Sequence, residues 1–274
     1  MKKLISTVLV AMIFLCGLAL FLYPTVSNLW NEHINAGLIS DYVSEQAVID
    51  ENQHTEVLEQ ARLYNQNLHS EAKLKELNLN YSDVLNPVGN GIMGYLEIPR
   101  ISVQLVIYHS LDEGLLQSGI GHMEGTALPV GGESTHCVLA GHSGLPSARL
   151  LTHLDQLSMG DRFSLHVAGE ELIYRVDDIS VVLPHQVEKL AVESGKDLVT
   201  LVTCTPYGIN SHRLLVRGTR VQPEETVTGS TIWLADEVVW IDPLYLVPVG
   251  IAVLLLGMAV VSIPRRLFRR KTGE

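Results

Sequence analysis

Residues 200–218, which read TLVTCTPYGINSHRLLVRG, decide the fold. Two runs of β-branched and aliphatic residues flank a polar turn, residues 205–211, that contains proline, glycine and asparagine, and this pattern is typical of a β-hairpin. Period-two alternation places Val202 and Cys204 on the same face of the first strand. The returning strand brings Arg213 beside Cys204, so we expect a thiol and a guanidinium at one end of the hairpin.

Similar short runs recur from Gly91 onward, separated by Gly, Pro, Asn and Asp. Seven strands in about 130 residues predict a mainly β domain that is a closed or nearly closed barrel. Between residues 149 and 161, leucines at helical spacing followed by Gly160 predict one helix packed on that barrel. The expected strands are 92–98, 101–108, 136–140, 162–167, 171–182, 197–204 and 212–221.

Residues 26–77 differ in composition and are rich in Glu, Gln, Asn, Leu and Ala. Their apolar positions recur mostly at intervals of four, which indicates helix. A polar break at residues 50–54 interrupts the pattern, so we expect two helices joined by a short turn.

Both ends of the chain carry uncharged apolar runs, residues 4–23 and 243–263, each long enough to cross a bilayer. Lys2 and Lys3 precede the first run. A basic cluster, which belongs on the cytoplasmic side of a membrane, follows the second. We therefore expect a two-pass cell-membrane protein with both termini cytoplasmic and the middle domain extracellular. The cluster consists of Arg265, Arg266, Arg269, Arg270 and Lys271.

A cleaved signal peptide is the alternative for the first run, because Lys2 and Lys3 would also serve as its basic region. The run is long for a signal peptide, and no small-x-small cleavage site follows Leu22 clearly. Retention as a membrane helix is therefore preferred. The expected divisions are 1–3 cytoplasmic, 4–23 membrane helix, 24–90 helical region, 91–221 barrel, 222–242 linker, 243–263 membrane helix and 264–274 cytoplasmic tail.

The net charge of the outer domain argues against nucleic acid as a partner. The chain has 19 Lys and Arg against 30 Asp and Glu, and seven of the basic residues flank the apolar runs. With Glu274 of the tail also set aside, 12 basic residues remain against 29 acids, so the outer domain carries a net charge of about −17, which repels nucleic acid. Spacings for a zinc site, a phosphate-binding loop or a calcium loop are absent from the sequence, so we expect no metal and no cofactor.

Two of the three cysteines lie in the outer domain, Cys137 and Cys204, and one disulfide is the most they could form. Cys137 lies inside an apolar strand, where a free cysteine usually behaves as a small buried hydrophobe. Cys204 ends a strand at the rim of the sheet, which holds a nucleophile rigidly where a carbonyl can reach it. We therefore take Cys204 as the candidate nucleophile.

His142 is the candidate acid and base, because it follows a strand directly and enters a Gly/Ser/Pro loop. His122 is its closest rival by the same test. Arg213 would hold a substrate carbonyl or the oxyanion of a tetrahedral intermediate, whereas Arg217 and Arg220 are interpreted as surface arginines. No carboxylate can be assigned as the group that orients His142.

These residues resemble the sortases, membrane-anchored cysteine transpeptidases of Gram-positive bacteria. The signature Thr-Leu-x-Thr-Cys followed by a strand-borne arginine is present as residues 200–204 and Arg213. The resemblance covers nearly all of residues 91–221 and is greatest to the pilus-assembling class C members. The stretches that carry it are 94–99, 121–132, 139–146 and 200–218.

The resemblance implies an eight-stranded sortase β-barrel and a role for each residue. Cys204 would attack the threonine carbonyl of an LPxTG-like sorting signal and form a thioester. His142 would protonate the leaving glycine amine, and Arg213 would stabilise the substrate carbonyl and the oxyanion. The acceptor amine would be a pilin lysine, or a cell-wall precursor if the enzyme anchors proteins to the wall.

One difference from the class C sortases concerns the lid that regulates access to the site. Many class C enzymes cover the site with a lid that carries an Asp-Pro-aromatic motif before the barrel, and residues 78–91 lack that motif. We therefore expect Cys204 to be accessible in the resting protein. Two other interpretations stay open, a thiol hydrolase that releases the acyl group to water and a catalytically silent membrane-tethered scaffold for envelope proteins.

Overall fold

The computed structural model describes residues 2–86 and 89–221. They fall into two compact parts that divide between Tyr23 and Pro24, and each is considered by itself. Helix α1 (Lys2–Val48) contains Pro24 and runs through both parts. Its most apolar window has a mean hydropathy of 2.3, so by length and composition this helix could cross a membrane. The linker at 222–242, the expected second membrane run at 243–263 and the tail at 264–274 lie outside the described residues.

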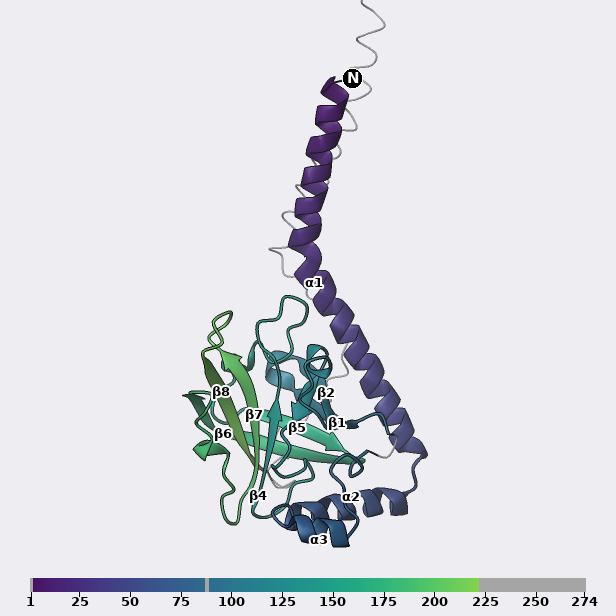
Figure 1. Cartoon of the computed structure of the whole chain (residues 1–274), viewed down its shortest axis with the longest axis vertical. Helices are drawn as coiled ribbons and strands as arrows, with labels where there is room; N and C mark the ends of the chain where they lie inside the picture. Colours follow the sequence, from purple (N-terminus) through teal and green to yellow (C-terminus); the bar gives the residue numbers. More distant parts are fainter. Residues whose placement is uncertain (1, 87–88, 222–274) are drawn as a thin grey trace, which may run out of the picture. The chain divides into compact units, whose positions relative to one another are not determined.

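The second part is built on a closed barrel of eight strands, which confirms the architecture expected from the sequence (Figure 1). Around the barrel the order is β1-β2-β3-β4-β7-β8-β6-β5. The pairs β2–β3 and β4–β7 are parallel and the other neighbours are antiparallel. The strands are β1 (Ile92–Ile98), β2 (Val103–Tyr108), β3 (Ile120–His122), β4 (Thr135–Ala140), β5 (Arg162–Val167), β6 (Glu170–Val182), β7 (Asp197–Thr205) and β8 (His212–Arg220).

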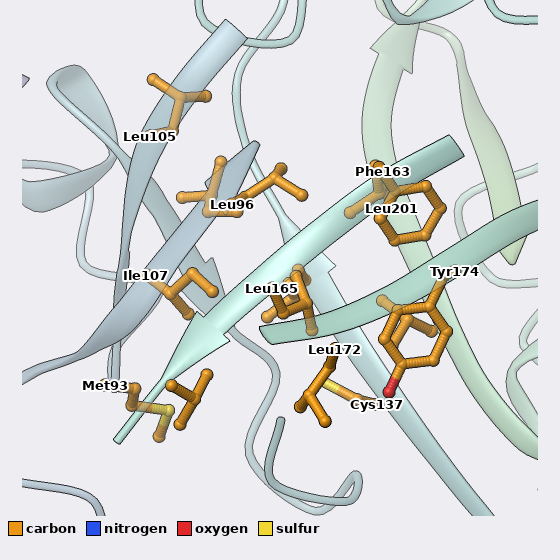
Figure 2. Packing of buried hydrophobic residues seen from close by; sticks show 14 of the residues in the cluster. Met93, Leu96, Leu105, Ile107, Cys137, Phe163, Leu165, Leu172, Tyr174 and Leu201 are labelled. Atoms are coloured by element: carbon orange, nitrogen blue, oxygen red, sulfur yellow. The ribbon is translucent and has the colours of Figure 1, made fainter. Parts of the chain in front are cut away.

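The barrel interior is filled by side chains that alternate along the strands (Figure 2). Leu96, Phe163, Leu165, Tyr174 and Leu201 are each completely buried, at 0% exposure. Burial of side chains this large removes apolar surface from water at roughly 25 cal/mol per Å², which is the main term that stabilises the barrel.

Two further helices follow α1. Helix α2 (Glu51–Gln66) begins after Asp50, whose carboxylate accepts a 2.8 Å hydrogen bond from the Gln53 amide and caps the helix. The short α3 (Glu71–Glu76) lies with α2 at one end of the barrel (Figure 1). The predicted break near residue 50 is confirmed, although the first predicted helix is continuous with the apolar N-terminal run.

The part of α1 after Pro24 packs on the barrel. The Tyr42 hydroxyl donates to the Met93 carbonyl at 3.1 Å and accepts from the Ala168 amide at 2.9 Å. Tyr42 thereby connects α1 to β1 and to the β5–β6 turn. Around it lies a separate apolar cluster made of Leu38, Ile39, Tyr42, Ile92, Tyr95, Val106 and Tyr108.

The helix predicted at residues 149–161 is wrong, because that stretch contains only a 3₁₀ turn, Leu154–Gln156. Leu150 adopts a left-handed backbone (φ 42°), which interrupts a right-handed helix. The leucines at 150, 151, 154 and 157 are nevertheless all buried, at 0–5% exposure. Their spacing therefore indicated burial correctly, but it is achieved by tight turns.

Leu201→Ala should lower the free energy of unfolding by about 2–5 kcal/mol, since it removes a fully buried side chain from the barrel core. Met159→Ala is the control, because Met159 is 63% exposed and its truncation should cost less than about 0.5 kcal/mol. Denaturant titration of the full chain in detergent, followed by circular dichroism, measures both. Equal losses in the two variants would contradict this account of the core.

Candidate active site

The register of the β7–β8 hairpin places Cys204 directly opposite Arg213. This is the arrangement that the alternation in the sequence predicts. Two residues farther from this end of the hairpin, Val202 of β7 lies opposite Leu215 of β8. Both residues belong to an apolar cluster separate from the barrel interior. Cys204 and Arg213 therefore lie on the outer face of the barrel wall, at the end of β7.

His142 lies next to this strand end, because both of its neighbours are bonded to β7. Gly141 accepts a 2.8 Å hydrogen bond from the Thr203 hydroxyl. Ser143 donates through its hydroxyl to the Cys204 carbonyl at 2.5 Å. The backbone on either side of His142 is thus attached to the residues that carry and precede the thiol, so the structure brings His142 to the end of the hairpin that holds Cys204 and Arg213.

The His142 side chain is half-buried, and its Nε2 is a buried nitrogen with no hydrogen-bond partner among the described residues. A buried polar atom without a partner costs free energy, so its position calls for an explanation. The described part of the chain also supplies no carboxylate hydrogen-bonded to this ring. The described residues therefore do not supply the orienting group that sequence reasoning could not assign.

The Arg213 guanidinium is held by the turn between β7 and β8. Its Nη1 donates to the Asn210 carbonyl at 3.2 Å and to the His212 carbonyl at 3.0 Å. Both bonds come from Nη1, and they orient the planar guanidinium. Its Nε and Nη2 groups take no part in these two contacts.

The β7–β8 turn lies against the loop that follows His142. Gly144 has a left-handed backbone (φ 76°), and a Cβ added there would lie 3.3 Å from the Tyr207 ring. Tyr207 and Ile209 at the turn are 67% and 71% exposed. Close approach of the two loops thus depends on glycine at position 144.

The two rival residues, Cys137 and His122, are both buried. Cys137 is 3% exposed inside the barrel (Figure 2), and burial raises the pKa of its thiol well above the ordinary value. His122 is 1% exposed, and desolvation lowers its pKa to about 4. Its ring nitrogens are engaged by the Tyr81 hydroxyl at 2.7 Å and the Ala127 carbonyl at 2.9 Å. A thiol held protonated and an imidazole fully bonded to its surroundings are poor candidates for catalysis.

Arg217 was predicted to be a surface residue, and this is wrong. Its side chain is only 18% exposed and pairs with Asp177 at 2.9 Å and with Glu193. Proximity to Arg217 and a bond from Thr219 hold the pKa of the Asp177 carboxyl below its usual range in spite of burial. Alternation places Thr200, opposite Arg217, on the same outer face as Cys204, but it gives no sign of the partner Asp177, which belongs to β6.

His136 was missed altogether. It is 1% exposed, and its two ring nitrogens contact the Thr200 hydroxyl at 2.7 Å and the Ala191 carbonyl at 2.8 Å. It therefore attaches the connection between β6 and β7 to the outer face of the barrel, on the same wall as Cys204. Together with Arg217, His136 holds the connection between β6 and β7, which borders the apolar cluster of Val138, Val202 and Leu215.

The segment that would correspond to a lid is packed into the core where it is described. Val84 and Leu85 are 2% and 3% exposed, and the Tyr81 hydroxyl donates to the His109 carbonyl at 2.5 Å. No hydrogen bond joins residues 78–86 to Cys204, His142 or Arg213. Among residues 2–86 and 89–221, no cluster of three His, Cys, Asp or Glu side chains could hold a metal ion.

Comparison with known proteins places residues 96–221 in a sortase domain. Sortase A of Bacillus anthracis is 32% identical over 127 residues, which make up 46% of this chain and 59% of that protein. The crystal structure of sortase C1 from Streptococcus agalactiae matches with a TM-score of 0.64 and 43% identity, over 68% of this chain and 98% of that one. A Clostridium perfringens sortase C, solved with the C-terminal cell wall sorting motif, matches with a TM-score of 0.59 and 38% identity, over 68% and 99%.

A small charged thiol reagent should modify Cys204 at least about tenfold faster than Cys137 in the folded protein, since Cys204 is partly exposed and Cys137 is a buried, protonated thiol. Peptide mass mapping after timed exposure measures both rates, and Cys204→Ser identifies the fast site. Protection of Cys204 that disappears when residues 66–90 are deleted would contradict the open site.

Proposed function

The chain belongs to the sortase family of cysteine transpeptidases, and we propose that it cleaves an LPxTG-like sorting signal between Thr and Gly and transfers the acyl group to an amine. The observation that carries this proposal is the pairing of Cys204 with Arg213 at the same strand end to which both neighbours of His142 are bonded. This arrangement supports a nucleophile, a base and a cation acting on one peptide carbonyl.

In the first half-reaction the Cys204 sulfur, as thiolate, attacks the threonine carbonyl of the signal. The carbonyl π-electrons move to oxygen, and the resulting oxyanion accepts hydrogen bonds from Arg213. When the tetrahedral intermediate collapses, the C–N bond to glycine breaks and His142 gives its proton to the leaving amine. The products are a threonyl thioester on Cys204 and a peptide that begins with glycine.

In the second half-reaction the acceptor amine attacks the thioester carbonyl and transfers a proton to His142. The C–S bond then breaks, which restores the Cys204 thiolate and leaves a new amide bond. Nε2 of His142 suits both proton transfers, because no group among the described residues occupies it.

Arg213 suits the oxyanion because its guanidinium is already oriented by two backbone carbonyls. A preorganised donor stabilises charge that develops in the transition state without reorganising at that moment, and loss of one such donor costs roughly 3 kcal/mol. The arginine fork can bond a carbonyl oxygen in the substrate and the oxyanion that replaces it.

For the acceptor we propose a pilin lysine, so that the product is an isopeptide bond between subunits. The support is the similarity to sortase C structures at 38% and 43% identity over nearly their whole length. Anchoring to a cell-wall precursor is the second candidate, favoured by the similarity to a sortase A. A thiol hydrolase would form the same thioester and release it to water.

For the location we propose a two-pass cell-membrane protein with its barrel outside and both termini in the cytoplasm. The apolar character of α1 supports the first pass. The second pass rests on the uncharged run at 243–263 and the basic residues after it. We also propose that no lid covers the site, which the core packing of Val84 and Leu85 supports.

With the full chain, a sorting-signal peptide and an amine acceptor, Cys204→Ala should abolish measurable product, and His142→Ala should lower the rates of acylation and transfer by about 10²–10⁴-fold, since the general acid and base is lost. Arg213→Ala should lower kcat by about 10²–10³-fold, since one oxyanion donor is lost, and Arg213→Lys should restore only part of that loss because lysine cannot reproduce the fork. Liquid chromatography with mass detection of the ligated peptide gives the rates.

The same assay without acceptor separates transfer from hydrolysis. If the amine changes neither the rate nor the product, the transpeptidase proposal fails and the protein is a thiol hydrolase. Full activity in Cys204→Ala would leave the scaffold interpretation.

A further inference from the structure

Three asparagines of α1, Asn28, Asn31 and Asn35, recur at intervals of three and four residues and therefore share one face of the helix. Asn28 and Asn35 are buried, at 8% and 3% exposure, and Asn31 is half-buried. Burial of an amide side chain costs free energy unless it is hydrogen-bonded, so each should have a definite partner. All three have backbone partners outside their own helix.

Two of these partners belong to the loop that follows His142. The Asn28 Oδ1 accepts a 2.8 Å hydrogen bond from the Arg149 amide. The Asn31 Nδ2 donates to the Ser147 carbonyl at 2.8 Å. Asn35 instead bonds the barrel, where its Oδ1 accepts from the Val106 amide at 3.3 Å and its Nδ2 donates to the Ser118 carbonyl.

The loop held by Asn28 and Asn31 closes back on His142. The Leu151 amide donates to the His142 carbonyl at 3.2 Å, and a bridge joins Leu145 to Ala148 nearer the tip. The Gly144 amide donates to the Thr152 hydroxyl at 3.0 Å. Residues 142–151 therefore form a closed loop with His142 at its base and the helix contacts at its tip.

The base of the loop is bonded to β7 through Ser143, and its tip is bonded to α1. The loop is thus held at both its base and its tip, which restricts how it can rotate about the β7 end. Because Nε2 of His142 has no partner of its own, the direction of the ring depends on the backbone that carries it.

We propose that Asn28 and Asn31 are positioning residues for His142. They make the part of α1 after Pro24 a component of the active-site scaffold, because they hold the tip of the His142 loop. This inference rests on the proposed function, in which His142 transfers the protons. A shift of the loop tip moves the imidazole relative to the Cys204 sulfur, and displacement of a catalytic group by about 1 Å can cost up to roughly a hundredfold in rate.

The test compares Asn28→Ala/Asn31→Ala with Asn35→Ala in the full chain in detergent. The three residues are on the same helix face and have the same kind of backbone partner, but the partners of Asn35 outside α1 are Val106 in β2 and Ser118 in the β2–β3 connection, not residues of the His142 loop. The pair of substitutions should lower kcat for peptide transfer by about tenfold or more with little change in KM. Asn35→Ala should change kcat by less than about twofold even if it lowers the melting temperature.

A double-mutant cycle separates positioning from a general loss of structure. If Asn28 and Asn31 act through His142, their replacement in a His142→Ala background should not slow acylation of Cys204 by the peptide any further. If the double alanine variant does not fold, Asn31→Asp removes the donor to Ser147 at nearly constant volume. Hydrogen exchange at the Arg149 amide provides a measurement independent of activity, and it should accelerate in Asn28→Ala but not in Asn35→Ala.

The outcomes distinguish this inference from the proposed function. An inactive wild-type chain, or a fully active His142→Ala, would overturn the proposed function. An active wild type in which the Asn28 and Asn31 variants behave like Asn35→Ala, or lose as much rate with His142 absent as with it present, would overturn the positioning role alone.

Discussion

The site depends on how β7 pairs with its two neighbours. β4 runs parallel to β7, so both strands finish at the same end of the barrel, and β8 runs antiparallel, so it begins there. A residue just after β4, a residue at the end of β7 and a residue at the start of β8 must then lie together. His142, Cys204 and Arg213 occupy these three places. Strand pairing holds Cys204 and Arg213, and the side-chain bonds of Thr203 and Ser143 hold the backbone on either side of His142.

The same strands separate two environments. Side chains on one face of β4 and β7 fill the barrel, among them Cys137 and Leu201, while those on the other face form the smaller cluster of Val138, Val202 and Leu215. The two cysteines of the barrel therefore differ in their exposure to solvent. Cys137, in the interior, is kept protonated by desolvation, and Cys204, on the outer face, stays partly exposed. Period-two geometry and strand length, not local composition, decide which thiol a substrate can reach.

Patterns along single strands predicted much of this. Alternation in residues 200–218 placed Cys204 beside Arg213, because strand pairing across a short turn is a local property. Strand β3 was missed since three residues around Gly121 are too few to show a period. The buried leucines of 149–161 were interpreted as a helix because burial at intervals of three or four also arises in tight turns. Arg217 was taken as exposed because its partner Asp177 lies on a different strand.

The asparagines of α1 show a further limit of sequence reasoning. Polar residues along a helix usually indicate a face in water, and nothing local distinguishes them from amides that bond a distant loop. Only the fold brings Asn28 within 2.8 Å of the Arg149 amide, 121 residues away. Contacts of this kind connect the part of α1 after Pro24 to the loop that follows His142.

The most direct test of the central claim is intact mass spectrometry of the full chain incubated with a sorting-signal peptide and no amine acceptor. The account predicts an adduct equal to the peptide up to its threonine, localised to Cys204 by fragmentation and discharged when an amine is added. An adduct on Cys137, or none under conditions in which the peptide is cleaved, would contradict it.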